Sequence, residues 1–148
     1  MARVLVIDDE EEVLLAVSRR LSREGFDVTP ATNSEQGIEK IETVDIPFDV
    51  VVSDMSMEGT QSGLNILNAA FSRDLFAEVI IMTAYGNVAN AVECMRRGAF
   101  DYIEKNQPGV DTYDLLANKV HGAMERRRRD VRTIELWERA AESKERMP

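Results

Sequence analysis

Five short apolar runs alternate along the chain with longer segments whose apolar residues recur at helical spacing. The runs have the length and the β-branched content of strands, and we place strands at 4–7, 26–29, 48–54, 79–82 and 99–104. The segments between them carry the one-sided apolar stripe of a helix, and we place helices at 10–24, 34–42, 64–73, 87–97 and from 111 onward.

Strand and helix therefore alternate throughout, which is typical of a parallel sheet with right-handed crossovers and helices on both faces. The third run contains Val50, Val51 and Val52, as expected for a central strand buried on both faces. Two arrangements share this alternation, half of a Rossmann fold and the flavodoxin-like order 2-1-3-4-5. Residues 8–12 are all acidic, so the first strand–helix turn lacks the Rossmann glycines and would repel a nucleotide or flavin phosphate. The sequence predicts a flavodoxin-like (βα)5 doubly wound parallel sheet with an extended C-terminal helix.

Two strands of this sheet end on carboxylates. The first runs into Asp8 and Asp9, and the central one ends on Asp54. In the order 2-1-3-4-5 these strands are neighbours, and ligands of such sheets bind at this edge. Three converging carboxylates repel one another unless a pKa rises or a cation neutralises them. Hard oxygen ligands suit Mg²⁺, and beside the metal one carboxylate can attack phosphorus and form an acyl phosphate.

The same edge offers groups for the other phosphoryl oxygens, which need a donor and a fixed cation. Thr83 ends the fourth strand, the backbone N–H of Ala84 follows it, and Lys105 ends the fifth strand. An ordinary strand threonine and a solvated surface lysine are the alternative interpretations of Thr83 and Lys105.

With these pieces in place, the sequence resembles the CheY-like receiver domain of two-component response regulators over about residues 2–124. The resemblance rests on four segments in a fixed order: VIDD at 6–9, VVSDMSM at 51–57, IMTAY at 81–85 and GAFDYIEK at 98–105. It implies that Asp54 accepts a phosphoryl group from the phosphohistidine of a histidine kinase or a phosphotransfer protein. It also implies that Asp9 and Asp54 bind Mg²⁺ directly, together with the Ser56 backbone carbonyl, and that Asp8 acts mainly through water.

The resemblance further implies that Thr83 and Lys105 contact the phosphoryl oxygens. Tyr102 falls at the position of the family's switch aromatic, which turns inward when Thr83 moves toward the phosphate. The face built from the fourth helix, the fifth strand and the fifth helix would then rearrange and change partner binding or oligomerisation.

Two positions depart from the family pattern. Glu58 stands where the family usually has a proline, so the loop after the central strand can have a different shape. Asn106 replaces the proline that usually follows the lysine in a cis bond. A cis bond before a residue other than proline costs about 3 kcal/mol, so either this bond is trans or the fold holds the strain, and Lys105 can sit slightly off its usual place.

The tail differs in charge from the rest of the chain, and we divide the chain into a receiver domain at 1–124 and a helical extension at 125–148. Residues 125–148 carry eight basic and six acidic side chains, within a chain of net charge −9. The acidic body argues against nucleic-acid binding, and the tail is too short for a helix-turn-helix unit. Its apolar positions, among them Val131, Ile134 and Trp137, recur at near-helical spacing. A solvated extension, a helix that forms a homodimer or docks a partner, and a linker to an output domain all remain open.

Other functional classes are weaker. No apolar run approaches the ~20 residues of a membrane span, and Cys94 has no partner for a disulfide, so we expect a cytoplasmic protein. A metal-dependent phosphohydrolase of the aspartyl-phosphate type usually has an Asp-x-Asp pair, but Ser56 stands two positions after Asp54. A constitutive docking module would not need the acids. We therefore expect a signalling phosphoacceptor and not an enzyme that acts on external substrates.

Overall fold

The computed structural model describes residues 1–55, 60–84 and 88–146. It contains one parallel sheet in the order β2-β1-β3-β4-β5, which confirms the predicted flavodoxin-like fold. The sheet is built from β1 (Arg3–Ile7), β2 (Asp27–Ala31), β3 (Val50–Asp54), β4 (Glu78–Ala84) and β5 (Asp101–Lys105). The helices are α1 (Glu11–Arg23), α2 (Ser34–Thr43), α3 (Thr60–Arg73), α4 (Val88–Arg96) and α5 (Thr112–Arg146).

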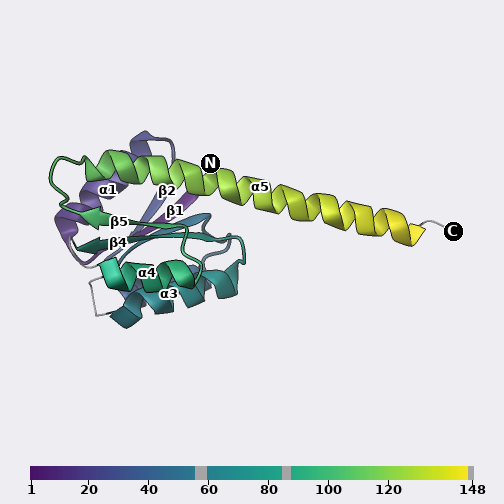
Figure 1. Cartoon of the computed structure of the whole chain (residues 1–148), viewed down its shortest axis with the longest axis horizontal. Helices are drawn as coiled ribbons and strands as arrows, with labels where there is room; N and C mark the ends of the chain where they lie inside the picture. The colour runs from purple at the N-terminus through teal and green to yellow at the C-terminus, as the bar shows by residue number, and fades with distance from the viewer. Residues whose placement is uncertain (56–59, 85–87, 147–148) are drawn as a thin grey trace.

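Helices cover both faces of the sheet, as Figure 1 shows. One apolar cluster joins the sheet to α1 and α5 and includes Val52, Ile80 and Ile103. The second cluster joins the opposite face to α2, α3 and α4 and includes Val51 and Ile81. Successive strand residues thus contribute to opposite clusters, as the two-residue period of a strand requires, and the sheet is buried on both sides.

Several boundaries differ from those predicted, and two of the differences have a clear local cause. The strand β2 continues through Pro30 to Ala31, because β2 is an edge strand and a proline is tolerated there. The helix α3 starts at Thr60 and not at 64. Gly63 was predicted to lie in a loop, but it is buried, and a Cβ built on it would lie 3.4 Å from Cys94 Sγ and 3.5 Å from Met55 Cε. The glycine therefore allows a close approach inside the helix.

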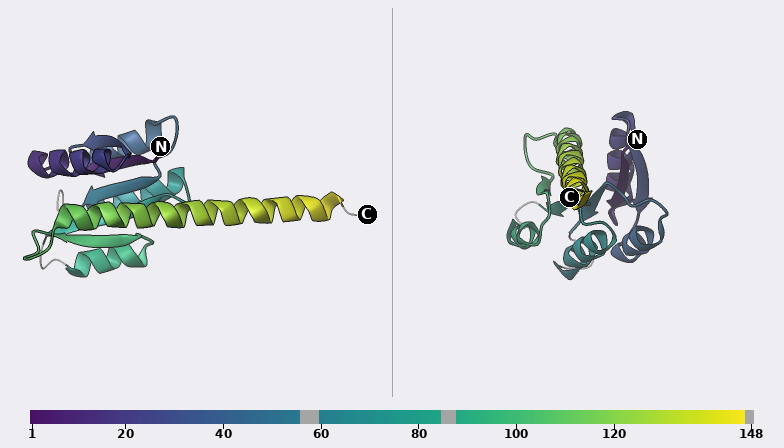
Figure 2. Two further views of the ribbon diagram at one scale, coloured as in Figure 1. Left: turned by 90° about the horizontal axis from the view of Figure 1, so that it is seen from above. Right: turned by 90° about the vertical axis from the view of Figure 1, so that its right-hand side faces the viewer.

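The helix α5 is 35 residues long. Its buried residues, from Leu116 to Met124, pack on the sheet, and its C-terminal part projects beyond the body (Figure 2). Trp137 in this projecting part is 69% exposed. The predicted extended helix is therefore present, whereas the division at residue 124 coincides with no break in the helix. Within the described ranges, none of the helices combines the length and the apolar character that crossing a bilayer requires.

Candidate functional site

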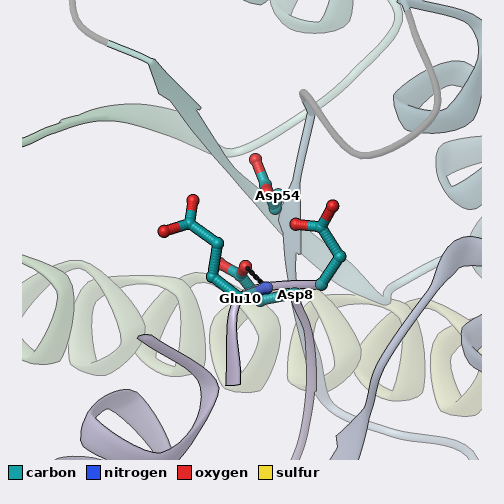
Figure 3. A group of neighbouring side chains, drawn as sticks. Asp8, Glu10 and Asp54 are labelled. Atoms are coloured by element: carbon teal, nitrogen blue, oxygen red, sulfur yellow. Dashed lines mark hydrogen bonds between the residues drawn. The ribbon is translucent and has the colours of Figure 1, made fainter. Parts of the chain in front are cut away.

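The acids predicted to converge lie together at the carboxyl edge of the sheet. Asp8 follows β1 and Asp54 ends β3, and the pairing of Ile7 with Ser53 places these two strand ends side by side. Asp8, Asp9, Glu10 and Asp54 each offer a carboxylate oxygen, and these oxygens lie within 4.8 Å of one another. Figure 3 shows Asp8 and Glu10 coming from the segment after β1 and Asp54 from the end of β3.

Burial divides this group into two pairs. Asp8 and Asp54 are 0% and 1% exposed, whereas Asp9 and Glu10 are exposed. Asp8 is held by backbone groups of β2 and of its own loop, because its N–H donates to Ala31 O at 3.1 Å and its Oδ1 accepts the Glu10 N–H at 2.8 Å. The chain turns here from β1 into α1, so the turn that starts the helix also orients the first acid.

Lys105 supplies the positive charge among these acids. Its Nζ lies 2.8 Å from Asp8 Oδ2, 3.1 Å from Asp54 Oδ2 and 3.5 Å from Glu10 Oε1. The side chain is almost fully buried and extends from the end of β5, across β4 from Asp54. Burial lowers the pKa of Lys105, but Asp8 and Asp54 outweigh it and raise that pKa overall, so the ammonium stays protonated.

The departure at Asn106 does not move Lys105 away from the acids. No peptide bond among the described residues is cis, so the bond after Lys105 is trans. Asn106 instead adopts a left-handed conformation with φ of 57°, which asparagine tolerates better than most residues. The chain therefore leaves β5 through backbone rotation at Asn106.

Asp8 makes the stability of the site depend on pH. Its burial raises its pKa above the ordinary 3.8, and the opposing effects of Lys105 and the Glu10 N–H do not cancel that rise. The stabilising contribution of this group is therefore present below pH 3.8 and is lost as the pH rises through the raised pKa.

In the presence of a chelator, we expect Asp8→Asn to unfold at a higher urea concentration than the wild type at neutral pH. The difference should shrink toward pH 3.8, and an Asn variant that is less stable at neutral pH would contradict this account.

Thr83 and Tyr102 lie on the face of the sheet that α3 and α4 cover. Val79 and Ile81 of β4 belong to the cluster beneath α3 and α4, so Thr83 follows them on that face. Tyr102 packs against the same cluster and pairs with Ile81 in register. Thr83 is fully buried and Tyr102 is half-buried. Met82, which pairs with Asp54, directly precedes Thr83, so Thr83 lies one residue further along the neighbouring strand.

Some predicted site features fall outside the described residues, namely Ser56 with its backbone carbonyl and Glu58. Glu10 was not predicted as a site residue, because only Asp8 and Asp9 of the acidic run at 8–12 were assigned to the site and the whole run otherwise served to exclude a phosphate-binding turn. Its position directly after the two aspartates is the signal that could have identified it.

The side chains present fit a hard divalent cation. All four acids offer oxygen, the ligand type that Mg²⁺ prefers. The two exposed acids border solvent, which suits a metal that keeps several water ligands. The buried pair is only partly compensated by the single charge of Lys105. A cation bound by these oxygens would reduce the remaining repulsion.

Comparison with known proteins gives a consistent assignment. The sequence profile described as "Response regulator receiver domain" matches residues 4–117. The chain is 36% identical over 103 residues to a putative response regulator NtrX-like of Rickettsia conorii, which covers 69% of this chain and 21% of the relative. It is 37% identical over 103 residues to the regulatory protein AtoC of Escherichia coli, with 70% of this chain and 22% of the relative covered. The chain thus spans about a fifth of the length of these two relatives.

Solved structures agree with this. A response regulator receiver domain protein from Clostridium thermocellum superimposes with a TM-score of 0.76 at 32% identity, covering 86% of this chain and 98% of that one. NtrX from Brucella abortus, solved in complex with ADP, superimposes with a TM-score of 0.80 at 27% identity. That match covers 95% of this chain and 30% of the other.

Proposed function

This chain belongs to the response regulator receiver domain family, and we propose on that premise that Asp54 is the residue that accepts its phosphoryl group. The donor is the phosphohistidine of a histidine kinase or of a phosphotransfer protein. The observation that carries the proposal is the contact of Lys105 Nζ with a buried Asp54 at 3.1 Å, inside a group of acids that can hold a divalent cation.

In the transfer, a carboxylate oxygen of Asp54 attacks phosphorus and forms a P–O bond. The P–N bond of the phosphohistidine breaks, and its electron pair stays on the imidazole nitrogen. Lys105 can donate to a phosphoryl oxygen from where it lies, and its protonated state suits it to charge that develops there. Thr83, one residue beyond the partner of Asp54 on β4, is the proposed hydroxyl donor.

Mg²⁺ is the proposed cofactor. Asp9 and Asp54 would hold it with the Ser56 carbonyl, and Asp8 would act mainly through water. When bound, the ion neutralises negative charge on the phosphoryl and carboxylate oxygens. Glu10 is a further acid of the same group. Because its side chain is exposed, we place it at the solvent-facing side of the site.

The phosphoryl group would act as a local charge change that biases a two-state element. We assign that element to the face formed by α4, β5 and α5, through Thr83 and Tyr102. Support comes from their shared sheet face and from the packing of Tyr102 on the cluster that includes α4. The sequence does not identify the protein that binds this face.

A small phosphodonor with Mg²⁺ tests the proposal against the phosphohydrolase alternative. We expect incorporation of up to one phosphoryl group per chain and no incorporation in the presence of a chelator. Continuous multiple turnover of an unrelated phosphate ester would instead favour the hydrolase. Failure of a correctly folded protein to take up any phosphoryl group with Mg²⁺ would favour a constitutive docking module.

A homodimer through the projecting part of α5 is a further proposal. Support comes from Trp137 and Leu136, which are 69% and 51% exposed on the part of α5 that projects beyond the body (Figure 1). The partner that we propose for this part of α5 is a second copy of the chain, because each copy then offers the same exposed apolar residues to the other. Sedimentation of the full chain should give a larger species than a chain ending at Asp130. Identical masses for both would remove the proposal.

A cytoplasmic location also stays a prediction, supported by the buried, unpaired Cys94.

A further inference from the structure

At the sheet edge opposite the acids, two consecutive arginines of α5 contact the starts of the strands. Arg126 donates through Nε to both carboxylate oxygens of Glu78 at 3.0 Å and through Nη2 to Oε2 as well. Glu78 begins β4 and is 3% exposed. The Arg126 guanidinium also lies 4.7 Å from the ring centre of Phe100, which precedes β5. One side chain thus joins α5 to two strands.

Arg127 joins two further segments. Its Nε lies 2.8 Å from Asp49 Oδ1, just before β3, and its Nη2 lies 2.8 Å from Asp74 Oδ2, just after α3. Both acids are fixed by backbone groups, because Asp49 Oδ2 accepts the Arg3 N–H and Asp74 Oδ1 accepts the Phe76 N–H, each at 2.8 Å. These acids are therefore rigid anchors for the arginine.

The five side chains Arg126, Arg127, Asp49, Asp74 and Glu78 form what we call the base clamp. Consecutive helical residues project about 100° apart around the axis, so the two arginines hold the helix from two directions and restrict its rotation and its tilt. The next two residues, Arg128 and Arg129, are exposed. In residues 128–146, all of which the structure describes, no side chain forms an ion pair with the body. Among the described residues, the clamp thus holds the last ion pairs between α5 and the body.

We propose that the base clamp sets the direction in which residues 128–146 leave the body, so that this part of α5 moves with the sheet as one rigid lever. The last described ion pairs between α5 and the body then lie at Arg127, three residues beyond the division expected from the sequence. The two arginines are positioning residues that act on the tail through the helix. The proposal concerns the edge far from Asp54 and holds whether or not Asp54 is phosphorylated.

The distance between the body and the tail tests this directly. Nitroxide labels would be placed on cysteines at the exposed positions Glu39 and Glu142, in the full chain with Cys94→Ala, and the distance distribution measured by pulsed electron resonance. The labelled chain is diluted with excess unlabelled chain, so that distances between two copies do not contribute, and we then expect one narrow peak in this background. Replacing both clamp arginines with methionine should broaden the peak and shift its mean.

The matched control replaces Arg128 and Arg129 with methionine, which removes the same charge from the same helix two residues later. We expect this control to keep the narrow peak. Because the double clamp variant can lose stability, Arg127→Gln alone serves as a second variant that keeps the Arg126 contact with Glu78, and it should give intermediate broadening. An unchanged distribution in folded clamp variants, or equal broadening in the control, would overturn the proposal.

Discussion

Replacing Asp54 with asparagine is expected to abolish uptake of a phosphoryl group while the fold is retained. The amide has nearly the same shape but lacks the carboxylate that attacks phosphorus, and nucleophilic catalysis depends on that group. The variant should also gain less stability from added Mg²⁺, because one oxygen anion is missing from the group of four acids. Incorporation of labelled phosphate and thermal unfolding with and without Mg²⁺ measure the two effects.

The matched control for this variant is Asp27→Asn, at an exposed acid at the start of the edge strand β2. It should take up the phosphoryl group at the wild-type rate and keep the full response to Mg²⁺. Uptake by the Asp54 variant at the rate of this control would mean that another residue is the acceptor.

Replacing Lys105 with methionine should have the second large effect, on both stability and rate. Methionine keeps the length and the apolar stem, but it leaves Asp8 and Asp54 buried side by side without a cation. Breaking a buried ion pair from one side costs about 3–5 kcal/mol, and we expect a loss of unfolding free energy of that order in a chelator. Phosphoryl uptake with Mg²⁺ should slow by roughly 10²–10³, as for removal of one charge-stabilising donor.

A second substitution separates the two causes. Asp8→Asn in the Lys105→Met background should recover part of the lost stability, because it removes one of the two unpaired carboxylates, but it should not recover the rate. The control is Lys119→Met, whose partner Asp101 is more exposed, so its cost should stay within about 1 kcal/mol. Urea unfolding measures all four proteins. A Lys105 variant as stable as the Lys119 control would show that Lys105 does not compensate the buried acids.

The fold followed from the sequence because two periodicities alternate without interruption, and the acidic first turn excluded the rival arrangement. The errors came from residues with a context-dependent meaning. The second strand was predicted to end at residue 29, yet β2 continues through Pro30, because an edge strand accommodates a proline. Gly63 was taken to mark a loop, yet it lies inside α3 where close packing requires a small residue. Local propensity does not report which strand lies at the edge or which helix face is crowded.

The gathering of acids was predictable for a topological reason, since strands one and three are neighbours in this sheet and both end on aspartate. The base clamp was not predictable in the same way. Arg127 lies 78 positions from Asp49 and 53 from Asp74, and four consecutive arginines look alike in the sequence. Only the orientation of α5 about its own axis determines that the first two arginines point to the sheet and the next two to solvent.

The most direct test of the central claim is to locate the phosphoryl group on the wild-type chain. After reaction with a small phosphodonor and Mg²⁺, the acyl phosphate can be trapped by reduction and the modified peptide sequenced by mass spectrometry. Our account predicts a single modified residue, Asp54, and none when a chelator replaces Mg²⁺. Modification of a different residue, or Mg²⁺-independent modification, would contradict it.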